Sequence, residues 1–87
     1  MQKSIYSREQ AVLQRLLRNL RQEAGLKQEE VASKLKTYQT FVSKYESGER
    51  NLDLPELRQV CHVFGLSLPE FAQLYEDALL QAEQNNL

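Results

Sequence analysis

The 87-residue sequence has little of what disulfide-rich, metal-binding and membrane proteins are built from. It contains one cysteine, one histidine, three glycines, two prolines and no tryptophan. The lone Cys61 cannot form an internal disulfide, which suits the reducing cytoplasm, and one Cys with one His leaves no zinc-binding set. No apolar run approaches the ~20 residues of a membrane helix, and the N-terminus has no apolar stretch like a secretory signal. We therefore expect a cytoplasmic protein that uses no metal or other cofactor.

The sequence also lacks a catalytic constellation. Cys61 and His62 are adjacent, and adjacent residues on a helix do not face each other, so they do not suggest a nucleophile with its base. Glu29 and Glu30 are likewise neighbours, which is more typical of a helix start than of a catalytic carboxylate pair. Since no glycine-rich phosphate-binding loop is present either, we expect no enzymatic activity.

What is present is typical of a small all-helical protein. Leu, Gln and Glu are abundant, whereas glycine and proline are scarce. A chain of this length is expected to form one domain over residues 1–87. Its core is small enough that oligomerisation would add useful stability.

The charges are distributed unevenly along the chain. Residues 1–50 contain ten Lys or Arg and six Asp or Glu, whereas residues 51–87 contain one basic and six acidic residues. The net charge is therefore +4 in the first segment and −5 in the second, within a total of −1. This asymmetry favours a cationic face for an anionic partner, with an acidic end kept away from it.

Periodic apolar residues and capping signals predict five helices. The first begins at Ser7, which opens a capping box, and ends at Gly25. Asp53 and Ser67 each precede Leu-Pro-Glu, a strong start signal, and Thr37 is a candidate N-cap for the third helix. The predicted ranges are 7–24, 28–35, 39–47, 54–64 and 68–84.

The segment 28–50 carries the functional signal, because it reads as two short helices joined by a tight turn. Helical spacing points one apolar set inward: Ala32, Leu35, Val42 and Tyr45. It leaves amides, hydroxyls, one cation and one apolar ring on the outside: Gln28, Gln39, Thr40, Phe41, Ser43 and Lys44. A helix face of this composition suits base edges in a DNA major groove.

Within residues 17–74, a set of residues follows the order and spacing of a known family, with no insertion or deletion needed to match it. It comprises Leu20-Arg21, Gly25-Leu26, Gln28-Glu29-Glu30-Val31-Ala32, Leu35, Gln39, Val42-Ser43-Lys44, Glu46, Gly48-Glu49-Arg50 and Val63-Phe64-Gly65-Leu66-Ser67-Leu68. This set resembles the Cro/C1-type helix-turn-helix family of phage repressors and bacterial regulators. The resemblance implies an all-α, lambda-repressor-like bundle of about five helices with its core over residues 10–75. The second and third helices would form the helix-turn-helix.

The resemblance places base-reading side chains on the helix over 39–47. Gln39 can donate to and accept from adenine, and Thr40 can bond a base edge or contact a thymine methyl group. Lys44, on the same face, can reach guanine or a phosphate, and Ser43 lies beside it. Phe41 has two interpretations: contact with a thymine methyl group, or packing on the preceding helix or on a partner protein.

A second group of residues would contact the phosphate backbone around this helix. The start of the helix over 28–35 resembles the family's phosphate contact, and a helix N-terminus favours an anion in any case. The group comprises Lys27, Gln28, Lys36, Tyr38, Ser47, Arg50 and Asn51. Each alone is more simply read as a solvated side chain, but together they form an electrostatic footprint.

The resemblance also implies a structural ion pair between Arg21 and Glu46, which would tie the first helix to the third. The chain departs from the family at two positions. Lys27 stands where a hydroxyl residue usually caps the second helix, which weakens that cap by about 1 kcal/mol. Lys36 stands where glycine is common, which costs about 1 kcal/mol if the backbone there is left-handed.

The helix over 68–84 extends past the resemblance, with a longer apolar face than the core needs. Its candidate dimer contacts are Phe71, Tyr75, Ala78, Leu79 and Ala82. We favour isologous dimerisation through this face, since single-domain readers of this type usually bind paired half-sites. The alternative is that the face folds back onto Val12 and Tyr6.

These features favour a sequence-specific regulator of transcription that binds double-stranded DNA, and we expect a homodimeric repressor on a palindromic operator. Two alternatives share the fold: an antitoxin, whose protein partner is a toxin, and a controller of restriction–modification genes. Neighbouring genes would separate them. A third alternative is a protein-interaction adaptor that has lost DNA binding, which an acidic C-terminal half and an exposed Phe41 would favour.

Overall fold

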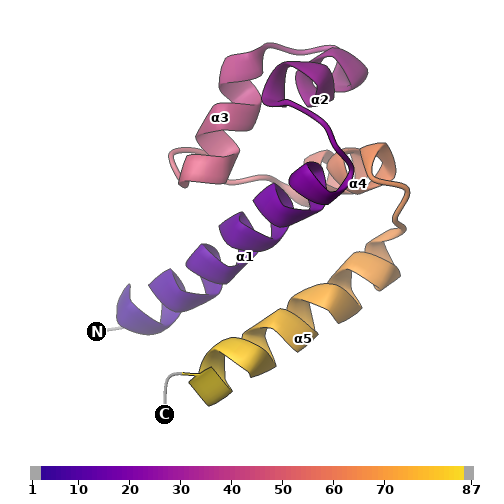
Figure 1. The fold of residues 1–87 in the computed structure, drawn as a ribbon. Helices are drawn as coiled ribbons and strands as arrows, with labels where there is room; N and C mark the ends of the chain where they lie inside the picture. Colours follow the sequence, from indigo (N-terminus) through magenta and orange to yellow (C-terminus); the bar gives the residue numbers. More distant parts are fainter. Residues whose placement is uncertain (1–2, 86–87) are drawn as a thin grey trace.

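The computed structural model describes residues 3–85, which form five α-helices. They are α1 (Lys3–Glu23), α2 (Gln28–Leu35), α3 (Gln39–Ser47), α4 (Leu54–Val63) and α5 (Leu68–Asn85). The described residues contain no strand. The predicted all-α fold, with short helices α2 and α3 joined by a tight turn, is therefore confirmed (Figure 1).

Two helix pairs define the shape of the molecule (Figure 1). α2 and α3 pack against each other at one end. The two longest helices, α1 and α5, lie side by side and run in opposite directions, so the start of α1 and the end of α5 lie together at the other end of the molecule. α4 contacts both α2 and α5 and so links the two pairs. The body measures 39 × 24 × 22 Å.

The core lies where the two helix pairs meet. Its buried members are Leu17, Val31, Ala32, Val42, Tyr45, Val60, Cys61 and Phe71. Ala32, Val42 and Tyr45 confirm the predicted inward face, whereas Leu35 is only partly buried at its edge. Helical spacing did not identify Val31, which is fully buried because α2 packs against both α3 and α4.

The predicted starts of α4 and α5 are confirmed by reciprocal capping bonds. Asp53 accepts a hydrogen bond from the Glu56 N–H at 2.8 Å, and Glu56 accepts one from the Asp53 N–H at 3.0 Å. Ser67 and Glu70 form the same pair of bonds at 3.3 and 2.8 Å. Each cap satisfies backbone donors that would otherwise lack a partner, which stabilises the helix by about 1 kcal/mol.

One predicted helix start and one predicted cap are wrong, whereas the predicted range of α3 is confirmed. α1 begins at Lys3 rather than at Ser7, so Ser7 lies inside the helix and cannot cap it. No glycine or proline stands between them, and lengthening an existing helix gains one backbone hydrogen bond per residue. Thr37 does not cap α3, because it lies one residue before the N-cap position; its N–H closes the end of α2 by donating to the Ala32 carbonyl at 2.9 Å. Tyr38 takes the N-cap position instead, without a side-chain bond.

The hydroxyl of Tyr45 is buried without a hydrogen-bond partner in the described residues. Burial is also the largest cause that raises the pKa of Tyr45 above its ordinary value. A buried polar group without a partner contributes its desolvation penalty and gains nothing in return. The ring, in contrast, is 2% exposed and belongs to the core.

We therefore expect Tyr45→Phe to leave the free energy of unfolding unchanged or to raise it by up to about 1 kcal/mol. Urea unfolding monitored by circular dichroism measures this directly. The matched control is Tyr75→Phe, which removes a hydrogen bond of 3.0 Å to the Glu9 carbonyl and should cost about 0.5–1 kcal/mol. A loss above about 1 kcal/mol in Tyr45→Phe would show that its hydroxyl is satisfied.

Candidate nucleic-acid interface

The turn between α2 and α3 depends on one left-handed residue. Lys36 has φ 60° and ψ 46°, and among the described residues it is the only non-glycine residue with a positive φ. Its N–H donates to the Ser33 carbonyl at 3.1 Å, so the end of α2 is satisfied. The left-handed conformation anticipated at Lys36 is thus present, at a residue type that adopts it with strain.

Replacing Lys36 by glycine should raise the free energy of unfolding by about 1 kcal/mol, because glycine has no Cβ to strain this conformation. Chemical denaturation of the two proteins tests this. Lys34→Gly is the matched control, since Lys34 lies in the regular part of α2; it should lose about 1 kcal/mol. If both glycine variants lose stability alike, the turn carries no strain at Lys36.

α3 keeps one side open to solvent. Gln39, Thr40 and Lys44 are exposed, and Ser43 is half-buried beside them. The opposite side of the helix is in the core. The predicted outward orientation is therefore confirmed for Gln39, Thr40 and Lys44, whose amide, hydroxyl and ammonium groups project from the same face of the helix.

A buried ion pair fixes α3 to α1. Glu46 is 4% exposed. Arg21 donates two hydrogen bonds to its carboxylate, from Nε to Oε2 at 2.6 Å and from Nη2 to Oε1 at 3.1 Å. The third donor of Arg21, Nη1, bonds the Leu26 carbonyl at 2.9 Å. The bond to Glu46 is the main cause that raises the pKa of Arg21 above its ordinary value. Two-point bonding of this kind fixes orientation as well as distance.

The Glu46 carboxylate orients the amide of Gln28 directly and, through Gln28, the amide of Gln39. Gln28 Nε2 donates to Glu46 Oε1 at 2.9 Å, and Gln39 Nε2 donates to Gln28 Oε1 at 2.6 Å. A carboxylate only accepts, so Gln28 must turn its NH₂ inward and its carbonyl toward Gln39. Gln39 then retains its own carbonyl and one N–H for an outside partner, which is the pair of groups that adenine N6 and N7 require.

Phe41 lies half-buried against the core rather than free on the surface. Its ring meets Tyr45 edge-on at 5.6 Å between centroids. The guanidinium carbon of Arg50 lies 4.9 Å from the Phe41 ring centroid, and Arg50 also forms an ion pair with Glu56. Phe41 therefore supports Arg50, and Arg50 is engaged within the chain instead of projecting as a free cation.

The other candidate phosphate contacts are mostly exposed. Lys27, Lys36, Tyr38, Ser47 and Asn51 are exposed, and Gln28 is half-buried. Asn51 accepts a hydrogen bond of 2.7 Å from Gln10 on α1, and the Ser47 hydroxyl donates to the Lys44 carbonyl at 3.1 Å. The weak cap at Lys27 is partly offset, because the Lys27 N–H bonds the Glu30 carboxylate at 2.7 Å.

Cys61 and His62 point to different environments, as expected for neighbours on a helix. Cys61 is fully buried, and burial raises the pKa of its thiol to about 11, so the thiol stays protonated. His62 is exposed. Across residues 3–85, no three His, Cys, Asp or Glu side chains gather as a metal site would need. The same stretch has no helix with the length and apolarity to cross a membrane.

The candidate dimer contacts on α5 divide into two kinds. Phe71 is in the core, so it is not a surface contact, and the Tyr75 hydroxyl bonds the Glu9 carbonyl of α1. Ala78, Leu79 and Ala82 are half-buried. Much of the apolar face of α5 thus folds back onto α1, where Val12 is 5% exposed.

Comparison with known proteins places this geometry in context. The helix-turn-helix family HTH_3 matches residues 17–71. The crystal structure of the clp gene regulator ClgR from Corynebacterium glutamicum is similar over 90% of this chain and 84% of that chain, with a TM-score of 0.75 and 25% sequence identity. No curated protein sequence matches the chain.

Proposed function

The chain belongs to the helix-turn-helix family, of the Cro/C1 type, and we propose that it is a transcriptional regulator that reads double-stranded DNA with α3. The single observation that carries this proposal is the open face of α3, where Gln39, Thr40 and Lys44 are exposed to solvent while the opposite side of the helix is buried. A helix fits the major groove, and these three side-chain types bond base edges there. The similar ClgR is a gene regulator by its title.

Gln39 and Lys44 are proposed to specify bases, with Thr40 and Ser43 beside them. The amide of Gln39 is already oriented by Gln28 and Glu46, so it loses little side-chain freedom on binding. Phe41 is proposed to act indirectly, by supporting Arg50. The half-buried ring removes the exposed aromatic surface that an adaptor role would have used.

The phosphate contacts are proposed to come from the edge of the α2–α3 unit. Lys27, Lys36 and Tyr38 are exposed there, and the N-terminus of α2 adds backbone donors and a favourable dipole. Arg50 would have to exchange Glu56 for a phosphate to join them. The acidic charge of residues 51–87 would repel the duplex elsewhere and so help to set the orientation of binding.

We further propose that two copies bind one palindromic operator and repress transcription. Two recognition helices would then enter successive major grooves about 34 Å apart, on half-sites about 10 bp apart. A toxin partner or a restriction–modification role would leave this mode of binding unchanged and would be decided by the neighbouring genes.

Fluorescence anisotropy with a random 30-bp duplex at low salt tests the proposal. We expect binding at micromolar protein that weakens steeply as salt rises, because Lys and Arg displace counterions from phosphates. Single-stranded DNA of the same length is the control, and it should bind less well since it has no major groove. No binding to the duplex at micromolar protein and low salt would favour an adaptor without DNA affinity.

A further inference from the structure

The backbone of Arg50 lies beside α3, but its side chain is held by α4. Its N–H donates to the Lys44 carbonyl at 3.2 Å, so the chain after α3 folds back against the last turn of that helix. The guanidinium forms an ion pair with Glu56 in the first turn of α4. Its carbon also lies over the Phe41 ring, 4.9 Å from the centroid. The Arg50 side chain is nevertheless 44% exposed, so a polyanion in solvent can reach it.

Glu56 is fixed in position by the N-terminal cap of α4. Its Oε1 accepts a hydrogen bond from the Asp53 N–H at 3.0 Å, and its own N–H donates to Asp53 Oδ1 at 2.8 Å. The second carboxylate oxygen, Oε2, is left for Arg50. A side chain that is already ordered loses little further freedom when it pairs, which removes part of the usual entropic cost of a surface ion pair.

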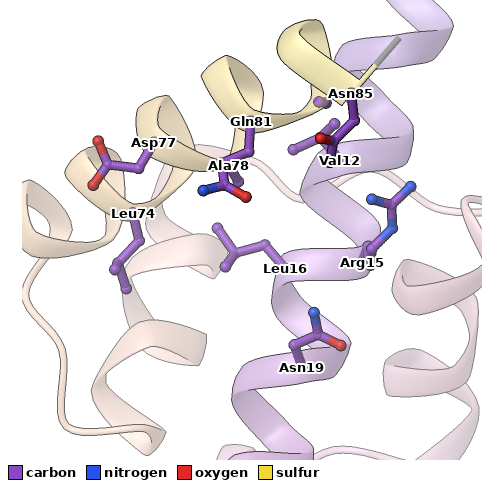
Figure 2. Close-up of a pocket in the computed structure, with 10 residues that line it drawn as sticks. Val12, Arg15, Leu16, Asn19, Leu74, Asp77, Ala78, Gln81 and Asn85 are labelled. Atoms are coloured by element: carbon purple, nitrogen blue, oxygen red, sulfur yellow. The ribbon is translucent and has the colours of Figure 1, made fainter.

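This ion pair links the basic first segment of the sequence to its acidic second segment. Within residues 3–85 the other ion pairs both end on Glu46, inside the basic segment. Figure 2 shows a contrasting case in the groove between α1 and α5, where Arg15 and Asp77 lie apart. Neither of these two has an ion-pair partner in the described part of the chain. Pairing with an acidic residue is therefore a particular property of Arg50 and not the general state of the surface arginines.

We propose that Glu56 is an internal competitor that withholds Arg50 from DNA phosphates and so limits the overall affinity for DNA. A carboxylate and a phosphate accept the same charge-assisted hydrogen bonds from a guanidinium. Because the cap fixes Glu56, a phosphate has to draw Arg50 away from it and break the ion pair. Phosphate contacts carry no sequence information, so every duplex meets this cost alike. The inference rests on the proposed function for the identity of the polyanion.

Glu56→Gln tests the competition while keeping the cap. The Gln carbonyl can still accept from the Asp53 N–H, but its NH₂ cannot accept a hydrogen bond from Arg50. We expect the dissociation constant for a random duplex to fall about two- to fivefold, the range that an exposed ion pair supports, and that for a selected operator to fall equally. The variant should also elute from a heparin column, a polyanion other than DNA, at higher salt than the wild type. Thermal melting checks that it folds.

Two matched variants remove one negative charge without releasing an arginine. Glu49→Gln lies in the loop after α3, where Glu49 is exposed, and Asp77→Asn lies on α5. Both have the same net charge as Glu56→Gln, so net charge alone would make all three elute from heparin together. We expect both controls to elute before Glu56→Gln.

Arg50→Ala separates the release of Arg50 from a simple loss of repulsion between Glu56 and the polyanion. On heparin and on duplex DNA, Arg50→Ala should weaken binding more in the Glu56→Gln background than in the wild type. Conversely, Glu56→Gln should change little when Arg50→Ala is also present, because no cation remains to be released.

The inference is overturned if Glu56→Gln elutes from heparin with the two charge controls, or if its tighter binding persists in the presence of Arg50→Ala. Duplex binding by the wild type without an effect of Glu56→Gln would reject the inference and leave the proposed function standing. If no variant binds duplex DNA but the heparin elutions follow the expected order, the proposed function is rejected and the competition at Arg50 stands.

Discussion

Glu46→Ala is expected to lower the free energy of unfolding by about 3–5 kcal/mol, because it leaves the charge of Arg21, whose side chain is only 13% exposed, without its partner. Two bonds from Arg21 and one from Gln28 end on this carboxylate. Their loss frees α3 from α1 and leaves Gln28 and Gln39 without a fixed orientation. DNA binding should therefore fall as well, although Glu46 is buried and touches no DNA in the proposed mode.

Urea unfolding gives the stability of this variant, and circular dichroism at low temperature confirms that helices remain. Glu49→Ala is the matched control, since Glu49 is exposed in the loop after α3 and its loss should change stability by less than about 0.5 kcal/mol. An unchanged melting curve for Glu46→Ala would mean that the ion pair contributes nothing to the fold.

Gln39→Ala is expected to reduce affinity for the preferred operator by about 1–3 kcal/mol, the value of one well-placed pair of bonds to a base. That corresponds to roughly 5- to 150-fold in the dissociation constant. The loss should be confined to one base pair in each half-site, at which the variant no longer distinguishes bases. Anisotropy titrations with the operator and its single-base variants measure both effects.

Two companion variants sharpen this result. Gln28→Ala removes the acceptor that orients Gln39, so it should weaken binding while Gln39 still prefers the same base. Gln84→Ala, exposed near the end of α5, should bind as the wild type does. If Gln39→Ala keeps the wild-type preference at every position, another residue reads the DNA.

The fold was predictable from local signals, because most of its boundaries are set by neighbouring residues. Asp53 and Ser67 cap helices through residues three positions away, and the family resemblance supplied the order of the helices. The start of α1 was not predictable in this way. Ser7 is a residue type that often caps helices, but no helix-breaking residue precedes it, and α1 already begins at Lys3.

The open face of α3 was also predictable, since helical spacing separates it from the core side. Its supporting network was not. Gln28 meets Glu46 across 18 residues of sequence, and Gln10 meets Asn51 across 41. No spacing rule links such positions. The contacts of Arg50 with Phe41 and Glu56 were not predictable either, because they cross the loop after α3. Residue types had suggested a free cation at Arg50 and had left the packing of Phe41 open.

The most direct test of DNA reading by α3 is selection of bound sites from a random pool of duplex DNA. The account predicts enrichment of one sequence made of two inverted half-sites with centres about 10 bp apart, and an altered base at one position of each half-site when Lys44→Ala is used. A pool that shows no enrichment after repeated selection, or an identical enriched sequence from both proteins, would contradict it.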